Sequence, residues 1–545
     1  MTLRVAMAQL DMLVGDIKNN TESVIKAAHE ARDHHQADVV VFPELTLTGY
    51  PPEDLLLRPS LDSRIEDSIQ TILNEVHDIY VVVGYPRRID GDLFNCAGVF
   101  HQGRMLGEYA KQKLPNFKVF DDKRYFEEGT EPLIVDVKNV KVGLSICEDI
   151  WHPEPSLQAQ EAGAELIINL SASPFHIEKM GVREQLLHQR AVETQLPIVF
   201  VNYMGAQDEL VYEGGSFVVN AQGQKIAQAP WFESGIYTVD FSVEETRTQK
   251  VVPLAGTIAP ALSIEESVYQ AMVLGLRDYI EKNRFKGIVL GLSGGIDSAL
   301  SLAVAVDAIG ADRVQAVMMP YTYTSSMSLE DAEEEATLLG VNYSVLPIEP
   351  MVTAFMETLA PEFEGYAKDT TEENLQARTR GVTLMAISNK KGYMVLTTGN
   401  KSEMAVGYAT LYGDMVGGYS VLKDVFKTLV FKLCRYRNTL GYVIPERVIT
   451  RPPSAELAPD QIDEDSLPSY DELDEILHLY IERDMSAEAI LEIGQFDRET
   501  VYRVLRLVDL NEYKRRQAPT GVRLTERGFG RDRRYPITNG WHIGD

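Results

Sequence analysis

The octapeptide at residues 291–298, Gly-Leu-Ser-Gly-Gly-Ile-Asp-Ser, is built to hold an anion. A short, largely apolar run at 286–290 precedes it and predicts a buried strand, and an apolar run at 299–309 follows and predicts a buried helix. A turn between a strand and a helix directs free backbone N–H groups and the positive end of the helix dipole toward one point. Gly294 and Gly295 carry no Cβ, so a phosphate can approach their backbone closely.

Three side chains of this octapeptide refine the expected chemistry. Ser293 and Ser298 add hydroxyl donors, whereas Asp297 would repel a phosphate unless a cation lay between them. We therefore expect Asp297 to be a Mg²⁺ ligand. The octapeptide matches neither of the common nucleotide-binding motifs, G-x-x-x-x-G-K-[ST] and G-x-G-x-x-G. The alternative is an ordinary tight turn, which a lone Gly-Gly pair would favour.

The first half of the chain carries a carboxylate, a lysine and a thiol that together could cleave an amide. Glu44 and Cys147 directly follow runs that predict strands, at 38–42 and 140–146, and Lys111 lies in the stretch YAKQKLPNF. A carboxylate can take the thiol proton, the thiolate can attack an amide carbon, and an ammonium can stabilise the oxyanion. Taken singly, each has an ordinary explanation as a loop carboxylate, a solvated charge or a small buried hydrophobe.

The elements predicted around these residues alternate between strands and helices. A helix is expected at 21–36, with Asn19, Asn20 or Thr21 as its cap. Strands are expected at 3–10, 38–42, 79–84, 140–146, 165–170, 198–202, 216–220 and 236–241. Short connections between alternating elements imply a layered α/β sandwich. The periodicity lapses around 242–263, which places a domain boundary there to within about ten residues.

The second half continues as alternating strands and helices after the octapeptide. Strands are expected at 313–319, 343–348 and 393–396, and helices at 328–340 and 374–390. The last strand runs into the hydroxyl-rich, acidic stretch TTGNKSE at 397–403. Open α/β sheets bind ligands at the carboxyl ends of their parallel strands, so this stretch and the octapeptide should face one site.

Composition narrows the class of protein. A chain of 545 residues predicts two large domains, and 45% hydrophobic with 24% charged residues is typical of a soluble globular protein. A net charge of −29 argues against general binding to nucleic acid or anionic membranes. The three cysteines lack metal-ligand spacing and fit a reducing cytosol. Neither an export signal nor an apolar stretch long enough to span a membrane is evident.

These motifs together carry a family resemblance. The octapeptide resembles the pyrophosphatase loop of adenylating ATP enzymes, and FPEL, KxxLPNF, FDDKRYF and SICEDIW resemble the nitrilase superfamily, which uses Glu, Lys and Cys in this order. A nitrilase-type half joined to an SGGIDS half resembles the glutamine-dependent NAD synthetases. The resemblance covers nearly the whole chain and includes ELTLTGYPPEDL, NLSASPF and TEENLQAR.

The resemblance implies a fold, a reaction and a set of partners. The fold would be a nitrilase-like α/β/β/α sandwich over 1–250, a linker over 251–262, and a doubly wound parallel-sheet domain, Rossmann-like with a PP-loop ATP pyrophosphatase site, over 263–545. The reaction would be ATP-dependent amidation of deamido-NAD to NAD through an adenylated intermediate, with ammonia from glutamine hydrolysis, release of AMP, pyrophosphate and glutamate, and Mg²⁺ as cofactor. Implied partners are deamido-NAD, ATP and glutamine or ammonia, with no nucleic acid or membrane. The enzyme would be cytoplasmic and a homo-oligomer built on a synthetase-domain dimer.

The resemblance also assigns site residues by their position in the motifs. Implied are a catalytic base, lysine and nucleophile at Glu44, Lys111 and Cys147; glutamine contacts at Phe117, Glu148, Ser173 and Lys179; ATP contacts at Gly291, Leu292, Ser293, Gly294, Gly295, Ile296, Asp297, Ser298 and Thr398; deamido-NAD contacts at Asn374, Glu403 and Lys514; and metal ligands at Asp297 and Glu403. Lys113 is the alternative to Lys111, and the K-x-x-L-P spacing selects Lys111.

Several positions depart from the family pattern or stay open. Phe117 stands where Tyr is usual, which matters little if its backbone makes the contact. Asp122 stands where the FDEKRYF pattern has Glu, so it must reach about one methylene further to orient the lysine. Arg378 could meet ATP phosphates or form a surface salt bridge. The basic run beyond Asn511 could be a solvated face, a nucleic-acid arm or the wall of an anion site, and the motif KRRQAP, with Lys514 on the substrate, favours the last.

Two other functions fit part of the pattern. One is an adenylating ligase that amidates another acceptor, of the cobyrinate or xanthylate type. The other is a nitrilase-type amidase whose second domain only senses a nucleotide, which would need neither Asp297 nor Glu403 as a metal ligand and would form no pyrophosphate.

Overall fold

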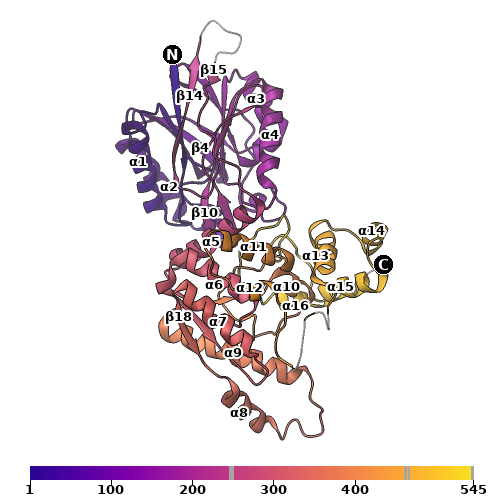
Figure 1. Ribbon diagram of the computed structural model, residues 1–545. Helices are drawn as coiled ribbons and strands as arrows, with labels where there is room; N and C mark the ends of the chain where they lie inside the picture. Colours follow the sequence, from indigo (N-terminus) through magenta and orange to yellow (C-terminus); the bar gives the residue numbers. More distant parts are fainter. Residues whose placement is uncertain (245–250, 459–462, 464–466, 542–545) are drawn as a thin grey trace. The chain divides into compact units, whose positions relative to one another are not determined.

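The computed structural model describes residues 1–244, 251–458, 463 and 467–541, and the chain divides into two compact units, residues 1–262 and 263–545. Residues 245–250, at the end of the first predicted domain, lie outside the described residues, as do parts of the acidic stretch after Ala458. Figure 1 labels the elements, and each unit is described by itself.

The first unit contains two large sheets and a hairpin. The seven-stranded sheet has the order β15-β14-β1-β2-β3-β4-β5, the six-stranded sheet the order β13-β12-β9-β8-β7-β6, and β10 pairs with β11. The strands are β1 Thr2–Gln9, β2 Val39–Val41, β3 Tyr80–Ile89, β4 Asp92–His101, β5 Arg104–Ala110, β6 Ile134–Val137, β7 Val140–Ile146, β8 Leu166–Ser171, β9 Ile198–Asn202, β10 Met204–Gln207, β11 Leu210–Glu213, β12 Phe217–Val219, β13 Lys225–Gln228, β14 Gly235–Val243 and β15 Val251–Pro253.

The helices of this unit cover the outer faces of the two sheets. They are α1 Ile17–Asp33, α2 Leu61–Glu75, α3 Pro153–Glu161 and α4 Lys179–Thr194, with short 3₁₀ turns η1 Glu53–Leu57, η2 Asp122–Arg124 and η3 Cys147–Trp151. Figure 1 shows α1 and α2 on one side of the paired sheets and α3 and α4 on the other. The unit is therefore a four-layer α/β/β/α sandwich, as the sequence predicted.

The alternation of side chains along the strands explains the layers. Successive residues of a strand point to opposite faces of its sheet. In β1, Val5 and Met7 belong to the core between the two sheets, whereas Ala6 and Ala8 belong to the core beneath α1 and α2. Both sets are buried, which is why these strands are apolar at nearly every position rather than at every second one.

One local prediction for this unit was wrong, and several strands were not predicted. The first helix begins at Ile17 rather than at 21, because Ile17 is itself buried, and neither Asn19, Asn20 nor Thr21 caps it. The first residues of the stretch predicted as a linker form β15, which pairs with β14. The prediction also missed the antiparallel strands β4, β5 and β6, whose periodicity is interrupted by polar and small residues.

The second unit is built on a five-stranded, entirely parallel sheet of order β18-β17-β16-β19-β20. Its strands are β16 Ile288–Gly291, β17 Val314–Met318, β18 Asn342–Val345, β19 Met394–Thr397 and β20 Tyr419–Ser420. Leu384 of α9 packs with Val289, Val317 and Val395 on one face, while α6 contacts β16 and β17 and is buried along nearly its whole length. Helices on both faces of a parallel sheet confirm the predicted doubly wound fold.

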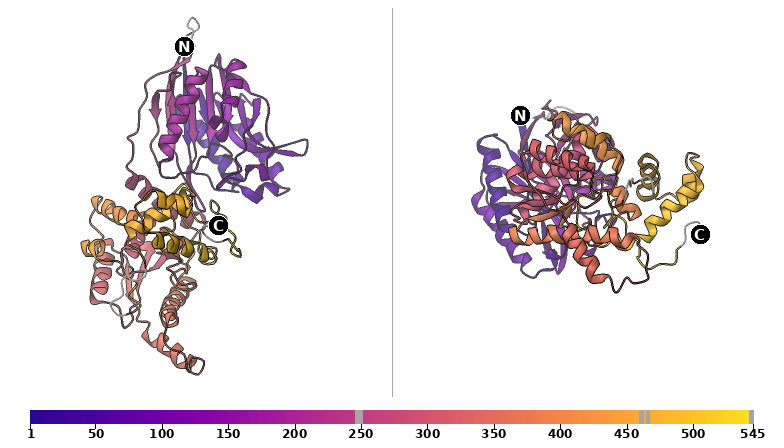
Figure 2. Two further views of the ribbon diagram at one scale, coloured as in Figure 1. Left: turned by 90° about the vertical axis from the view of Figure 1, so that its right-hand side faces the viewer. Right: turned by 60° about the horizontal axis from the view of Figure 1, so that its bottom comes forward.

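The helices of this unit form two groups. The sheet-covering and connecting helices are η4 Ala311–Arg313, α5 Ile264–Lys282, α6 Ile296–Ile309, α7 Ser326–Leu339, α8 Glu349–Leu359, α9 Thr370–Lys391, α10 Lys401–Val406, α11 Lys427–Thr439 and α12 Glu446–Thr450. The C-terminal group comprises α13 Tyr470–Leu477, a π-helical turn η6 His478–Glu482, α14 Ala487–Glu492, α15 Arg498–Leu510 and α16 Glu512–Arg515. In Figure 2 this group, gold to yellow, lies together, and it shares one apolar core with α10.

Within the octapeptide, the fold requires a glycine at position 294. It adopts a φ of +78°, and a Cβ placed there would lie 2.4 Å from the backbone oxygen of Ser328 at the start of α7. The turn between β16 and α6 is thus in direct contact with the next helix, and any side chain at 294 would push the two apart.

Gly294→Ala should therefore destabilise the protein more than the same change at a glycine that also has a positive φ but has free space around its Cβ position. Gly340, which ends α7 at a φ of +70°, has no atom within 4 Å of a Cβ, so Gly340→Ala should cost only the conformational strain of about 1–2 kcal/mol. Thermal unfolding of both variants measures the difference. Equal loss of Tm in the two would show that the contact with Ser328 relaxes without cost.

Candidate active sites

The first unit brings Glu44, Lys111 and Cys147 together at the ends of three strands. Glu44 follows β2, Lys111 follows β5 and Cys147 follows β7, and all three side chains are buried. Lys111 Nζ lies 2.7 Å from Glu44 Oε1. Glu44 and Lys111 are 67 residues apart along the sequence, and Lys111 and Cys147 are 36 apart. The fold thus brings a carboxylate, an ammonium and a thiol into one buried cluster.

Lys111 is held in its charged form by two carboxylates. Besides Glu44, Asp122 Oδ2 accepts a hydrogen bond of 2.7 Å from Lys111 Nζ, so an aspartate at this position does reach the lysine. Burial disfavours the charge on Lys111, but Asp122 and Glu44 outweigh it and raise the lysine pKa well above its ordinary value. The ammonium therefore stays protonated at every physiological pH.

The Cys147 thiol is protonated in this arrangement. Burial raises its pKa well above the ordinary value and the charge of Glu44 adds to the effect, while Lys111 opposes it. Its backbone has a φ of 43°, a left-handed conformation that is uncommon for a residue other than glycine and is found at functional sites. Nucleophilic attack from this thiol requires a base, and Glu44 is the neighbouring carboxylate.

Glu44 is fixed in place by two neutral donors that the sequence did not single out. Asn95 Nδ2 donates to Glu44 Oε1 at 2.8 Å, and the backbone N–H of Ala172 donates to Glu44 Oε2 at 3.2 Å. With Lys111 on Oε1 as well, both oxygens of the carboxylate have a donor. These contacts set the direction in which the base presents its lone pairs.

Asp149 organises the loop that carries the lysine. Its carboxylate accepts from the backbone N–H groups of Gln112, Lys113 and Ile146 and from the Tyr109 hydroxyl, at 2.8–3.0 Å. Burial raises the Asp149 pKa to about 6 despite these donors. The Lys113 ammonium instead pairs with Glu154 at 3.5 Å, so the structure places Lys111, not Lys113, beside Glu44.

The four residues predicted to bind glutamine lie around the same strand ends. Lys179, at the start of α4, has its Nζ 4.3 Å from the ring centroid of Trp151, and Phe117 is about half exposed. Burial raises the pKa of Glu148 to about 7 and lowers that of Lys179 to about 8. Each of these two groups can therefore change its charge near neutral pH.

Ser173 is positioned by a buried arginine that the sequence analysis missed. Arg183 Nε donates to Ser173 Oγ at 3.1 Å, and its Nη2 donates to the Ser173 carbonyl. Asn202 Oδ1 accepts from the Ser173 N–H at 3.0 Å, and Arg183 itself pairs with Glu213. A single arginine ten residues along the chain carries no motif, which is why only the structure finds it.

A second site lies at the carboxyl ends of the parallel strands of the second unit. A cavity of about 290 Å³ is lined by the octapeptide apart from Gly294, together with Thr398 and Glu403. Ser298 Oγ accepts from the Ser293 backbone N–H at 3.2 Å and lies 3.1 Å from Ser293 Oγ, which closes the turn upon itself. The two stretches predicted to face one site do so.

Lys427, which the sequence analysis missed, joins the two predicted metal ligands. Its ammonium donates to Asp297 and, at 3.2 Å, to Glu403 Oε1. Asn400 Nδ2 donates to the other oxygen of Asp297 at 2.9 Å. Burial raises the Glu403 pKa to about 8; Lys427 opposes this shift and Asp297 adds to it. The two carboxylates converge on one positive charge, although the described residues contain no cluster of three metal-ligating side chains.

Asn374 and Lys514 do not line this cavity, but each contacts a segment beside it. Thr410 Oγ1 donates to Asn374 Oδ1 at 2.8 Å, and Lys514 Nζ donates to the carbonyls of Gly407 and Ala409 at 2.7 and 2.9 Å. Both residues therefore hold the segment 407–410, two of whose residues do line the cavity. Arg378, left open by the sequence, donates to the carbonyl of Leu411.

The segment that follows α12 is tied over the octapeptide. Arg451 donates to the carbonyl of Gly294 at 2.9 Å and to Ser328 Oγ at 3.1 Å. Glu456 accepts from the hydroxyls of Ser325 and Ser328 at 2.9 and 2.8 Å. Residues 451–457 thus form one wall of the cavity, a feature that no local pattern in this polar, proline-containing stretch indicates.

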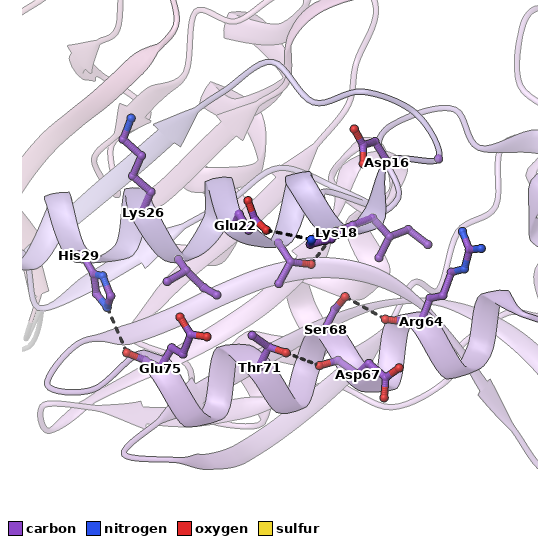
Figure 3. Close-up of a pocket in the computed structure, with 14 residues that line it drawn as sticks. Asp16, Lys18, Glu22, Lys26, His29, Arg64, Asp67, Ser68, Thr71 and Glu75 are labelled. Carbon is purple, nitrogen blue, oxygen red and sulfur yellow. Dashed lines mark hydrogen bonds and ion pairs between the residues drawn. The ribbon is translucent and has the colours of Figure 1, made fainter.

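Another cavity, of about 780 Å³, lies between α1 and α2 and is shown in Figure 3. Its hydroxyl groups donate to their own helices, as Ser68 does to Arg64 O and Thr71 to Asp67 O, and its charges include the Lys18–Glu22 pair. No cysteine lines it. The chemistry expected of this chain therefore belongs to the two sites at the strand ends.

Comparisons with known proteins agree with this division. The carbon-nitrogen hydrolase family matches residues 4–251, and the NAD synthase family matches residues 268–518. Over its whole length the chain is 50% identical to the glutamine-dependent NAD(+) synthetase of Acinetobacter baylyi, covering all of that protein, and 45% identical to that of Thermotoga maritima, with 98% of each chain covered.

Solved structures give the same result. The glutamine-dependent NAD(+) synthetase of Acinetobacter baumannii, determined in complex with ADP, is 48% identical with a TM-score of 0.80 and full coverage of both chains. The synthetase from Cytophaga hutchinsonii has a TM-score of 0.85 at 23% identity, with 99% and 98% covered, and supports the fold alone.

The fold and the comparisons define an amide-forming ligase in which a carbon-nitrogen hydrolase domain precedes an NAD synthase domain. The chain belongs to the glutamine-dependent NAD(+) synthetase family. The predicted family, fold class and enzyme class are confirmed, and the two rival functions, a ligase for another acceptor and a nucleotide-sensing amidase, are not supported. The family implies ATP, deamido-NAD and glutamine as substrates. None of the helices that the structure describes is both long and apolar enough to cross a bilayer.

Proposed function

We propose that this chain makes NAD from deamido-NAD by way of an adenylated intermediate, using ammonia that the Glu44, Lys111 and Cys147 site releases from glutamine. The observation that carries the proposal is the buried contact of 2.7 Å between Lys111 and Glu44, in the domain whose family hydrolyses carbon-nitrogen bonds. The products are NAD, AMP, pyrophosphate and glutamate.

Glutamine hydrolysis follows from the positions of three side chains. Glu44 takes the proton of the Cys147 thiol, and the thiolate attacks the side-chain amide carbon. Lys111, held charged by Glu44 and Asp122, stabilises the negative charge that develops on the amide oxygen. Glu44 then returns the proton to the leaving nitrogen, which departs as ammonia and leaves a thioester on Cys147. Water, deprotonated by Glu44, hydrolyses the thioester to glutamate.

The residues around this centre suit the two charged groups of a free amino acid. Glu148 is an acceptor for the α-ammonium group of glutamine, and Lys179 is a donor to its α-carboxylate. Ser173, oriented by Arg183, and the backbone of Phe117 complete the contacts that we assign to glutamine. The two charged groups on the α-carbon distinguish glutamine from a simple amide.

Amide formation belongs to the cavity of the second unit. The nicotinate carboxylate attacks the α-phosphorus of ATP, pyrophosphate leaves toward the N–H groups of the octapeptide, and ammonia then displaces AMP from the acyl adenylate. Residues 291–298 and Thr398 contact ATP in this proposal. Asn374, Glu403 and Lys514 act on deamido-NAD, with Asn374 and Lys514 working through the segment 407–410 that they hold. Lys427 joins them as a donor to phosphate oxygens.

Asp297 and Glu403 fit a Mg²⁺ ion. Two carboxylates that already share one ammonium present hard oxygen ligands toward a common point, which is what Mg²⁺ prefers. When bound there, the ion would neutralise charge on the phosphates. Asn400 holds one oxygen of Asp297 and thereby orients the carboxylate.

The remaining expectations about organisation are also proposals. We place the glutaminase domain at 1–250, the linker at 251–262 and the synthetase domain at 263–545, in a cytoplasmic homo-oligomer built on a dimer of synthetase domains. Light scattering of the purified protein measures the size of the assembly.

Cys147→Ala should abolish glutamine-dependent NAD synthesis, by at least about 10³-fold, because no thioester can form. High ammonium chloride at mildly alkaline pH, where more NH₃ is unprotonated, should restore synthesis. Glu44→Ala and Lys111→Ala should behave in the same way. Steady-state assays with the two nitrogen sources make the comparison, and full glutamine-dependent synthesis by Cys147→Ala would refute this assignment of the ammonia source.

Asp297→Asn should show the reverse pattern. Losing one of the two carboxylates should reduce ATP-dependent synthesis by about 10²-fold or more with either nitrogen source. Basal glutamine hydrolysis at Cys147 should persist. The measurement is AMP release against glutamate release, at increasing Mg²⁺ concentrations. Normal ATP-dependent turnover by this variant would remove Asp297 from the metal site.

The affinity for glutamine should pass through an optimum between about pH 7 and pH 8. Below pH 7, protonation of Glu148, whose pKa is about 7, removes the attraction for the α-ammonium group. Above pH 8, Lys179, whose pKa is about 8, loses its charge and its attraction for the α-carboxylate. The KM for glutamine should therefore rise on both sides. In Lys179→Arg the alkaline rise should vanish, since arginine stays protonated; if it persists, Lys179 does not cause it.

A further inference from the structure

Tyr212, in the hairpin strand β11, has a buried hydroxyl with no hydrogen-bond partner among the described residues. Its side chain has no exposed surface. A buried hydroxyl left without a partner costs roughly 1–3 kcal/mol. Since buried polar groups in proteins are nearly always satisfied, a partner that is not part of this chain is expected at this oxygen.

The ring of Tyr212 is firmly held by its surroundings. It makes edge-to-face contacts with Tyr50 and Tyr203, with ring centroids 6.0 and 5.1 Å apart. The Tyr203 hydroxyl, in contrast, is fully used: it donates to Met12 O at 2.7 Å and accepts from Met12 N–H at 3.0 Å. Tyr203 and Tyr212 are thus neighbours in one core, but only the Tyr203 hydroxyl has hydrogen-bond partners among the described residues.

Tyr212 lies within electrostatic range of Glu44 and Cys147. It belongs to the same apolar core as Ala172, whose backbone N–H donates to Glu44 Oε2. The charges of Glu44 and Cys147 both act on its hydroxyl, after burial and Tyr203, to raise its pKa well above the usual value. A neutral, firmly protonated hydroxyl is a hydrogen-bond donor at every physiological pH.

We propose that the Tyr212 hydroxyl binds the small neutral molecule that is exchanged beside Glu44 during glutamine hydrolysis. That molecule is the ammonia formed when the carbon-nitrogen bond breaks, and then the water that attacks the thioester. Both have a lone pair that accepts the tyrosine O–H and N–H or O–H groups that can donate to Glu44. The inference rests on the proposed function, because it requires hydrolysis at Cys147.

Tyr212 keeps its proton throughout the two steps. In the first, the Cys147 sulfur bonds to the amide carbon, and nitrogen leaves with the proton that Glu44 returns to it. In the second, Glu44 takes a proton from water, the water oxygen bonds to the carbon, and the carbon–sulfur bond breaks as Cys147 regains its proton. The hydroxyl only orients the ammonia whose lone pair forms in the first step and then the water whose lone pair attacks in the second.

The test is Tyr212→Phe in the full-length protein, with Tyr203→Phe as the matched control. Removing the unsatisfied Tyr212 hydroxyl should leave Tm unchanged or raise it, while glutamate formation should fall by about tenfold or more. Removing the Tyr203 hydroxyl, which has two partners, should lower Tm and leave the glutaminase rate within about twofold once measured on folded protein. Ammonium-dependent NAD synthesis should be unchanged in both variants.

Two further readouts separate the two molecules. If Tyr212 orients the attacking water, Tyr212→Phe should accumulate the thioester on Cys147, detected by mass spectrometry of the quenched enzyme. If Tyr212 holds ammonia, Tyr212→Phe should instead incorporate ¹⁵N-ammonium into glutamine more slowly, relative to its rate of glutamate formation. Either signature supports the proposal. An unchanged rate, or a slower rate with neither signature, would overturn it.

Failure of the proposed function would look different. Cys147→Ala that still hydrolyses glutamine would show that the glutaminase centre lies elsewhere, whatever Tyr212→Phe does. If Cys147→Ala is inactive with glutamine and Tyr212→Phe is fully active, only the inference about Tyr212 is wrong.

Discussion

The burial of a lysine ammonium between two carboxylates is the interaction on which both proposed sites depend. In the first unit Lys111 lies between Glu44 and Asp122, and in the second Lys427 lies between Asp297 and Glu403. A buried ion costs several kcal/mol in lost hydration, and it persists only where opposite charges and hydrogen bonds compensate. Each lysine therefore requires its carboxylates, and each carboxylate is held in a fixed direction by its lysine.

This arrangement has different consequences in the two units. Beside Cys147, the triplet leaves a protonated thiol near a carboxylate with fixed orientation, so the attack that we propose would be coupled to proton transfer. Beside the octapeptide, Lys427 reduces the repulsion between Asp297 and Glu403 and would do the same for an incoming triphosphate. Burial nevertheless keeps the Glu403 pKa near 8. The same combination of one ammonium and two carboxylates thus suits the base that we propose in one domain and the anion-binding surface that we propose in the other.

The sequence predicted the parts of this arrangement that lie in short motifs. Glu44, Cys147 and the octapeptide follow apolar runs that form buried strands, and the parallel sheet brings Asp297 and Glu403 to one edge. The partners from distant segments could not be predicted. Asn95 and Lys427 act over 51 and 130 residues, and single polar residues carry no spacing that reveals a contact.

The antiparallel strands β4 and β5 were missed for a related reason. Their side chains do not alternate cleanly, since β4 is buried along most of its length and β5 is largely half-buried or exposed. Yet β5 carries the chain directly to Lys111, and the Lys111 N–H donates to the Asn95 carbonyl on β4. The sequence therefore identified Lys111 by its motif alone. The strand that positions it, β5, is evident only from its pairing with β4 in the structure.

A third buried lysine shows that such a triplet does not by itself indicate chemistry. Lys401 lies between Asp424 and Glu482, at 2.8 and 2.7 Å, and is as deeply buried as Lys111. Asp424 also accepts from the backbone of Leu524 and Thr525, so this triplet fastens the C-terminal segment to α10. None of its three members lines the cavity of the second unit, whereas Asp297, Glu403 and Lys427 all do. In the second unit, access to this cavity, rather than buried charge, distinguishes the Lys427 triplet from the Lys401 triplet.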